Sequence, residues 1–67
     1  MYNWKKVMSG NDVSKLLINN GWELIRQKGS HRQYKKNNIV CSVPMHPDIK
    51  TGTLSAIKRT IELAEKL

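Results

Sequence analysis

The fold of this chain is decided by residues 22–44, which read WELIRQKGSHRQYKKNNIVCSVP. Three short segments within this stretch, 22–27, 31–36 and 39–43, are rich in strand-forming residues. The connections between them are too short for a parallel crossover. We therefore predict a three-stranded antiparallel meander.

Turn-forming residues separate the three segments. Gly29-Ser30 is a two-residue connection of the type that closes a tight hairpin. Asn37-Asn38 ends the second segment. Pro44 stops pairing after the third, because proline has no N–H to donate to a neighbouring strand.

A helix over about residues 10–20 is predicted before the meander. Ser9 is a suitable N-cap, and Asp12 follows three residues later, as a capping box requires. Gly21 suits the left-handed position just past the helix end. The apolar stripe of this helix comprises Val13, Leu16, Leu17 and Ile18.

A second helix is predicted to begin around Thr51 to Thr53, either of which can cap it. Its apolar stripe comprises Leu54, Ile57, Ile61 and Ala64. The predicted class is α+β, in the order α-β-β-β-α. Both helices should cover one face of the sheet, which leaves the other face for a ligand or partner. We expect one domain over residues 1–67, with 1–8 as an N-terminal extension.

Positive charge dominates the composition. Twelve Lys and Arg oppose five Asp and Glu, giving a net charge of +7 and a pI of about 9.9. Such an excess on a small domain favours polyanions, so nucleic acid is the leading partner class. The segment 26–36 carries five basic residues and no acidic one, which indicates a phosphate-facing strip. An acidic partner protein would satisfy the same charge.

Other functional classes find little support in the sequence. One cysteine permits no internal disulfide, and one cysteine with two histidines gives no recognisable zinc pattern. No apolar run is long enough to span a membrane, and the N-terminus lacks a secretory signal. We expect a cytoplasmic protein with no metal or other cofactor. Cys41 should be a small buried apolar residue rather than a nucleophile.

Chemistry is most plausible at the turn that ends in His31. RNA carries its own nucleophile, the ribose 2′-hydroxyl, so cleavage needs a base, an acid and cations. Histidine suits either proton-transfer role because its ordinary pKa, about 6.5, is close to working pH. The predicted RNA-binding residues around it are Lys28, Gly29, Ser30, Arg32, Tyr34, Lys35 and Lys36. From composition alone, an ordinary surface histidine beside a plain turn is the simpler interpretation.

Four further residues have two readings each. His46 can be a second acid–base group, but its proline-flanked loop favours a loop-positioning role. Trp22 can stack on a base, but it follows a helix stop in a strand and is expected in the core. For Tyr34 the two roles are about equally supported, because an aromatic side chain among basic residues on a strand can stack on RNA. Trp4 is either a docking anchor or a terminal residue without a fixed place.

A set of short motifs follows in order along residues 9–62. They are NGW at 20–22, KGSH at 28–31 with Tyr34 after it, VP at 43–44 with His46 after it, and GTL at 52–54 with Ile57 after it. Taken together, this ordered set resembles the HicA toxin family. Two departures lie outside the motifs: residues 1–8 precede the usual family start, and residues 62–67 lack the glycine that often follows the last helix.

The resemblance implies an mRNA interferase with a double-stranded-RNA-binding-domain-like fold and no required metal. It places the family's catalytic histidine at His31, the histidine of the Gly-Ser-His motif. It also implies a HicB-like antitoxin that covers the active site, with the toxin itself a monomer inside a hetero-oligomer. Two alternatives stay open: a non-catalytic module that binds double-stranded RNA, and a basic face that serves mainly to meet an acidic protein.

Overall fold

Within residues 2–67, the part of the chain that this computed structural model describes, the elements follow the order α-β-β-β-α. Their bounds are α1 Gly10–Asn19, β1 Glu23–Lys28, β2 His31–Lys36, β3 Ile39–Pro44 and α2 Thr51–Glu65. The strands form one antiparallel sheet in the order β1-β2-β3. The predicted α+β class and the antiparallel meander are confirmed. Met1, the first residue of the expected extension, lies outside the described residues.

The two hairpin turns use left-handed backbone conformations. Gly29 has φ +57°, and Asn37 and Asn38 have φ +51° and +65°. Two consecutive positive φ angles match the turn geometry that suits the twist of antiparallel strands, and asparagine tolerates it. The sequence correctly located both turns.

Pro44 belongs to β3, where it is paired with His31. The prediction that pairing stops before Pro44 is therefore wrong by one residue. Proline is tolerated here because it is the last residue of an edge strand, where no ladder hydrogen bond from its nitrogen is needed.

The two helices begin differently. Ser9 caps α1 in a capping box: its side chain accepts from the Asp12 N–H at 3.1 Å, and the Asp12 carboxylate accepts from the Ser9 N–H at 3.2 Å. Helix α2 has Lys50 at its N-cap, with no side-chain cap hydrogen bond. The threonine cap predicted for α2 is wrong, because the helix already begins at Thr51 and both threonines lie inside its first turn.

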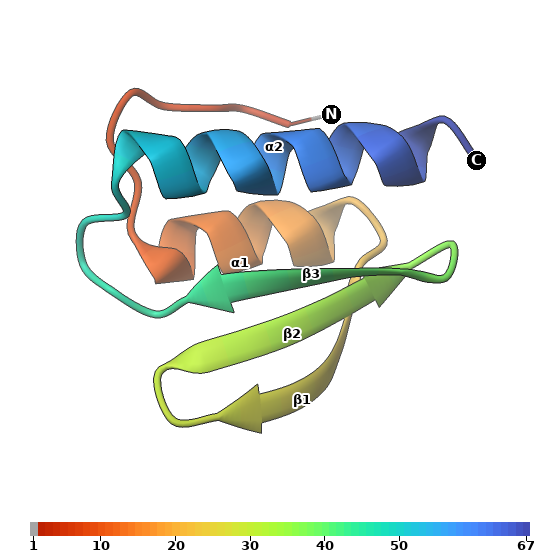
Figure 1. The fold of residues 1–67 in the computed structure, drawn as a ribbon, viewed down its shortest axis with the longest axis horizontal. Helices are drawn as coiled ribbons and strands as arrows, with labels where there is room; N and C mark the ends of the chain where they lie inside the picture. The colour runs from red at the N-terminus through yellow and green to blue at the C-terminus, as the bar shows by residue number, and fades with distance from the viewer. Residues whose placement is uncertain (1) are drawn as a thin grey trace.

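Both helices lie on the same side of the sheet and contact β3, and α1 also contacts β1 (Figure 1). The sheet contributes Tyr34, Cys41 and Val43 to the core, and every residue of β1 is exposed. The predicted apolar stripe of α2 is buried in full. The other core residues are Met8, Val13, Leu17, Trp22 and Ile49. The face of the sheet that is turned away from the helices is therefore free.

The N-terminal segment runs beside α2 (Figure 1). The Tyr2 hydroxyl donates to Glu65 at 2.7 Å and accepts from the indole N–H of Trp22 at 2.8 Å. The Trp4 ring stacks on Tyr2 with centroids 6.0 Å apart, and the Lys58 ammonium lies 5.1 Å from the Trp4 ring centre. Trp4 thus anchors this segment to the domain. No helix within residues 2–67 is long and apolar enough to cross a membrane.

Candidate active site

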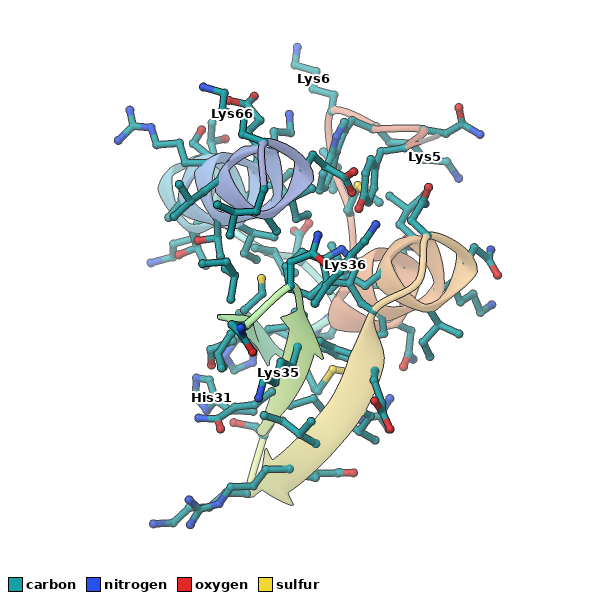
Figure 2. All side chains as sticks on the ribbon, turned by 90° about the vertical axis from the view of Figure 1, so that its right-hand side faces the viewer. Lys5, Lys6, His31, Lys35, Lys36 and Lys66 are labelled. Carbon is teal, nitrogen blue, oxygen red and sulfur yellow. The ribbon has the colours of Figure 1, made fainter. Side chains whose placement is uncertain are left out.

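The free face of the sheet carries His31 among basic side chains. Directly paired residues of antiparallel strands share one face. The register places Lys28 and Pro44 on either side of His31, and Arg26 and Ser42 on either side of the next outward residue of β2. Lys35 projects from the same side of β2 as His31, away from the helices (Figure 2). This face combines a histidine with three cations, Lys28, Arg26 and Lys35, and with one carboxylate, Glu23, which is paired with Lys35.

Two of the predicted RNA-binding cations, Arg32 and Lys36, lie on the opposite face of β2. The Lys36 ammonium lies 2.9 Å from Glu65 and 2.7 Å from the Asn20 carbonyl, on the helical side of the sheet (Figure 2). Arg32 is half-buried, and its Nε has no hydrogen-bond partner among residues 2–67. These two cations are therefore directed away from the face that carries His31.

Tyr34 is 0% exposed and forms part of the core. The stacking role predicted for it is wrong, because a ring with no exposed surface cannot offer its face to a base. Because successive residues of a strand point to opposite faces, Arg32 and Lys36 share the inner face with Tyr34. His31 and Lys35 share the outer face. Gly29 and Ser30 lie in the exposed turn next to His31.

An open cleft of about 570 Å³ lies beside His31. Strands β2 and β3, the loop after β3 and the start of α2 all contribute to its walls. Its polar lining residues are His31, Ser42, His46, Asp48, Lys50 and Thr53. Since α2 begins here without a side-chain cap, the cleft also meets the positive end of a helix, which favours anions.

The loop that carries His46 is held by backbone hydrogen bonds. The Met45 N–H donates to the Ser30 carbonyl at 2.6 Å, and the Gly10 N–H donates to the His46 carbonyl at 2.8 Å. Close packing adds to this: a Cβ on Gly10 would lie 2.5 Å from the Pro44 carbonyl oxygen. The hairpin turn and the start of α1 therefore fix where His46 lies.

The two imidazoles lie next to each other at this cleft, in an edge-to-face arrangement. Their ring centroids are 6.4 Å apart, and the ring planes meet at 80°. Within residues 2–67 neither ring has a hydrogen bond to the protein, so both are available to a substrate. Both side chains are exposed to solvent.

Sequence reasoning missed several residues at this cleft. Ser42 could have been found, because it alternates with the core residues Cys41 and Val43 along β3. Asp48, Lys50 and Thr53 gave no such signal, since their position depends on how the loop folds back. The sequence places Arg26 only within the basic stretch, and its position on the outer face follows from the register of β1.

Two further features bear on metal binding and on the reactivity of the cysteine. The described residues contain no group of three His, Cys, Asp or Glu side chains that could hold a metal ion. Burial raises the pKa of the Cys41 thiol to about 11, so it stays protonated near neutral pH. Cys41 is 2% exposed, which confirms the prediction of a small buried apolar residue.

A model of the family described as "HicA toxin of bacterial toxin-antitoxin" matches residues 10–63. The chain belongs to the HicA toxin family. The resemblance seen in the ordered motifs is thereby confirmed, and the match covers α1, the whole sheet and most of α2. Comparisons with curated proteins and with solved structures give no match. As a HicA toxin, this chain has a toxin role and an antitoxin partner in general terms.

Proposed function

We propose that this toxin is an endoribonuclease that cleaves mRNA in the cleft beside His31. The observation that carries the proposal is the position of the His31 imidazole. It stands at an open cleft, on the basic face of the sheet, with no hydrogen bond to the protein among residues 2–67. The ring is therefore accessible to a substrate, next to the cation of its paired residue Lys28.

The reaction needs a proton acceptor or donor close to neutral pH, and histidine has this property. The attacking group is the 2′-hydroxyl of the RNA itself. Lys28 is paired with His31, and Lys35 lies four residues further along β2 on the same outer face (Figure 2), so both can bind phosphates of an RNA strand that crosses this face. The uncapped start of α2 can bind a further phosphate oxygen. This route calls on no metal or other cofactor.

The same proposal includes a HicB-like antitoxin as the partner that neutralises the toxin. A protein with an acidic surface would complement the cations of the outer face and would block the cleft by covering it. We propose that the toxin acts as a monomer and joins a hetero-oligomer only with its antitoxin.

The test compares the wild type with His31→Ala on a labelled transcript in the presence of EDTA, alongside growth after induction. We expect the variant to lose about 10²–10⁴-fold of the cleavage rate while RNA affinity and fold remain. Gln33→Ala is the matched control, because Gln33 is the next outward residue of β2 and has no ionisable group. It should cleave and arrest growth like the wild type.

Two outcomes would reject the proposal. Full toxicity and cleavage by His31→Ala would show that His31 has no catalytic role. Tight binding of duplex RNA without cleavage by any form, wild type included, would instead identify a non-catalytic double-stranded-RNA-binding module, which the basic outer face could also serve.

A further inference from the structure

We propose that His46 is the second acid–base group of this ribonuclease, paired with His31 across the scissile phosphate. The inference rests on the proposed function, and it reverses the expectation that His46 only positions its loop. Its basis is the juxtaposition of the two imidazoles at one cleft, from β2 and from the loop after β3.

The separation of the rings suits a single phosphodiester. A group that gives or takes a proton lies about 2.6–3.2 Å from the oxygen concerned. Two imidazoles with centroids 6.4 Å apart can therefore reach two different oxygens of one phosphate that contacts both rings from the open side of the cleft. The cleft beside them is open to solvent on the face that carries the basic residues, so an RNA strand can enter.

The imidazole of His46 does not position the loop. Backbone atoms do this: the His46 carbonyl accepts from the Gly10 N–H at 2.8 Å, and the neighbouring Met45 N–H donates to the Ser30 carbonyl at 2.6 Å. Pro44 and Pro47 restrict the loop further, since proline fixes φ. The side chain itself is exposed and makes no hydrogen bond to residues 2–67. The loop therefore holds the imidazole in place, rather than the reverse.

The two histidines complete a balanced transfer. A bond forms between the ribose 2′-oxygen and phosphorus while the bond from phosphorus to the 5′-oxygen breaks. The neutral imidazole takes the 2′-hydroxyl proton, and the other, protonated imidazole gives its proton to the departing 5′-oxygen. The products are a 2′,3′-cyclic phosphate and a 5′-hydroxyl end. Solvent then returns each histidine to its starting protonation state.

Such a pair predicts a bell-shaped dependence of the rate on pH, because one ring must be neutral and the other protonated. The charged groups around the two rings are Lys28 on β1 and Asp48 and Lys50 on the loop. From α2 the cleft receives only the uncharged Thr53. In this proposal the two limbs of the profile belong to the two histidines.

The experiment measures His46→Gln and His31→Gln on two substrates. One is a ribodinucleotide, whose 5′-oxygen must be protonated as it leaves. The other is a nucleoside 3′-(p-nitrophenyl phosphate), whose leaving group departs without a proton. Met45→Leu is the loop control, because it keeps the volume of the neighbouring side chain and removes no ionisable group. Circular dichroism and RNA affinity accompany each rate.

We expect His46→Gln to lose about 10²–10⁴-fold on the dinucleotide, with RNA affinity retained and one limb of the pH profile gone. One of the two histidine variants should regain most of its rate on the nitrophenyl ester, and that residue is the acid. Met45→Leu should stay close to the wild type with both limbs present.

The pairing would be overturned by a His46→Gln protein that cleaves like the wild type. It would equally be overturned if RNA affinity fell in step with the rate, or if neither histidine variant recovered on the activated ester. These results differ from failure of the proposed function, in which the wild type itself does not cleave either substrate.

Discussion

Gly10→Ala is the substitution whose effect the structure specifies most closely. Gly10 is the first residue of α1 and is buried. An added Cβ would lie 2.5 Å from the Pro44 carbonyl oxygen and 2.6 Å from the Met45 Cα. Both are backbone atoms, so neither can rotate away. The start of α1 cannot simply retreat either, because the Gly10 N–H donates to the His46 carbonyl.

Whether Gly10→Ala stabilises or destabilises the fold depends on two opposing free-energy changes. Replacing glycine by alanine where the backbone permits it stabilises a protein by about 0.4–1 kcal/mol. Overpacking a tight site destabilises by about 1–3 kcal/mol. We therefore expect Gly10→Ala to lower the free energy of unfolding by about 1–2 kcal/mol. Gly52→Ala is the matched control: it lies in the first turn of α2 with nothing within 4 Å of the new Cβ, so it should be stabilised.

Thermal and urea unfolding, followed by tryptophan fluorescence, measure both variants. For a domain of this size each kcal/mol corresponds to about 4–8 °C in Tm. Gly10→Ala should also cleave RNA more slowly, because the shift that relieves the clash displaces the loop of His46. The reasoning would be refuted if Gly10→Ala were as stable as the wild type or more so.

Three further predictions concern single side chains of the sheet and of α2. Lys35→Gln should weaken RNA binding and reduce the slope of log affinity against log salt by about one. Lys36→Gln should leave that slope unchanged, because Lys36 faces the helices. Equal slopes for the two variants would contradict the assignment of the two lysines to opposite faces. The pKa of Glu65 is lowered by the hydrogen bond from the Tyr2 hydroxyl and then by that from Lys36. Its contribution to stability is thus present above the ordinary glutamate pKa of about 4.3 and lost as pH falls through the lower folded-state value. Urea unfolding of Glu65→Gln should show a deficit at neutral pH that disappears in acid; a deficit independent of pH would contradict this. Tyr34→Phe removes a buried hydroxyl that has no hydrogen-bond partner among residues 2–67, so stability should stay equal or rise and RNA affinity should not change. A loss of more than about 1 kcal/mol in urea unfolding would show that the hydroxyl is bonded.

The sequence was sufficient for the elements and their order. Turn residues such as Gly29 and Asn37, the capping box at Ser9 and the helical spacing of apolar residues in α2 act over a few neighbouring positions. Interactions of that range are visible in the order of residues alone. The motif around His31 was equally local, and its match to a known family was confirmed.

Assigning the basic residues of β2 to a face required the tertiary structure. This strand reads HRQYKK, and Tyr34 is its only large apolar residue. Because Tyr34 can either bind RNA or pack in the core, the sequence of the strand does not show which alternate residues face the core. The burial of Tyr34 shows which alternate residues of β2 face the core. Lys36 shares the inner face with Tyr34, and Lys35 and His31 lie on the outer face.

The meeting of His31 and His46 was also beyond the sequence. The register of β2 on β3 pairs His31 with Pro44, and the loop then returns over the hairpin turn and the start of α1. Local sequence determined the periodicity and the turns, because these depend on neighbouring residues. The tertiary structure alone decided which distant side chains share the cleft, because strand register and loop position are set by long-range hydrogen bonds and by packing.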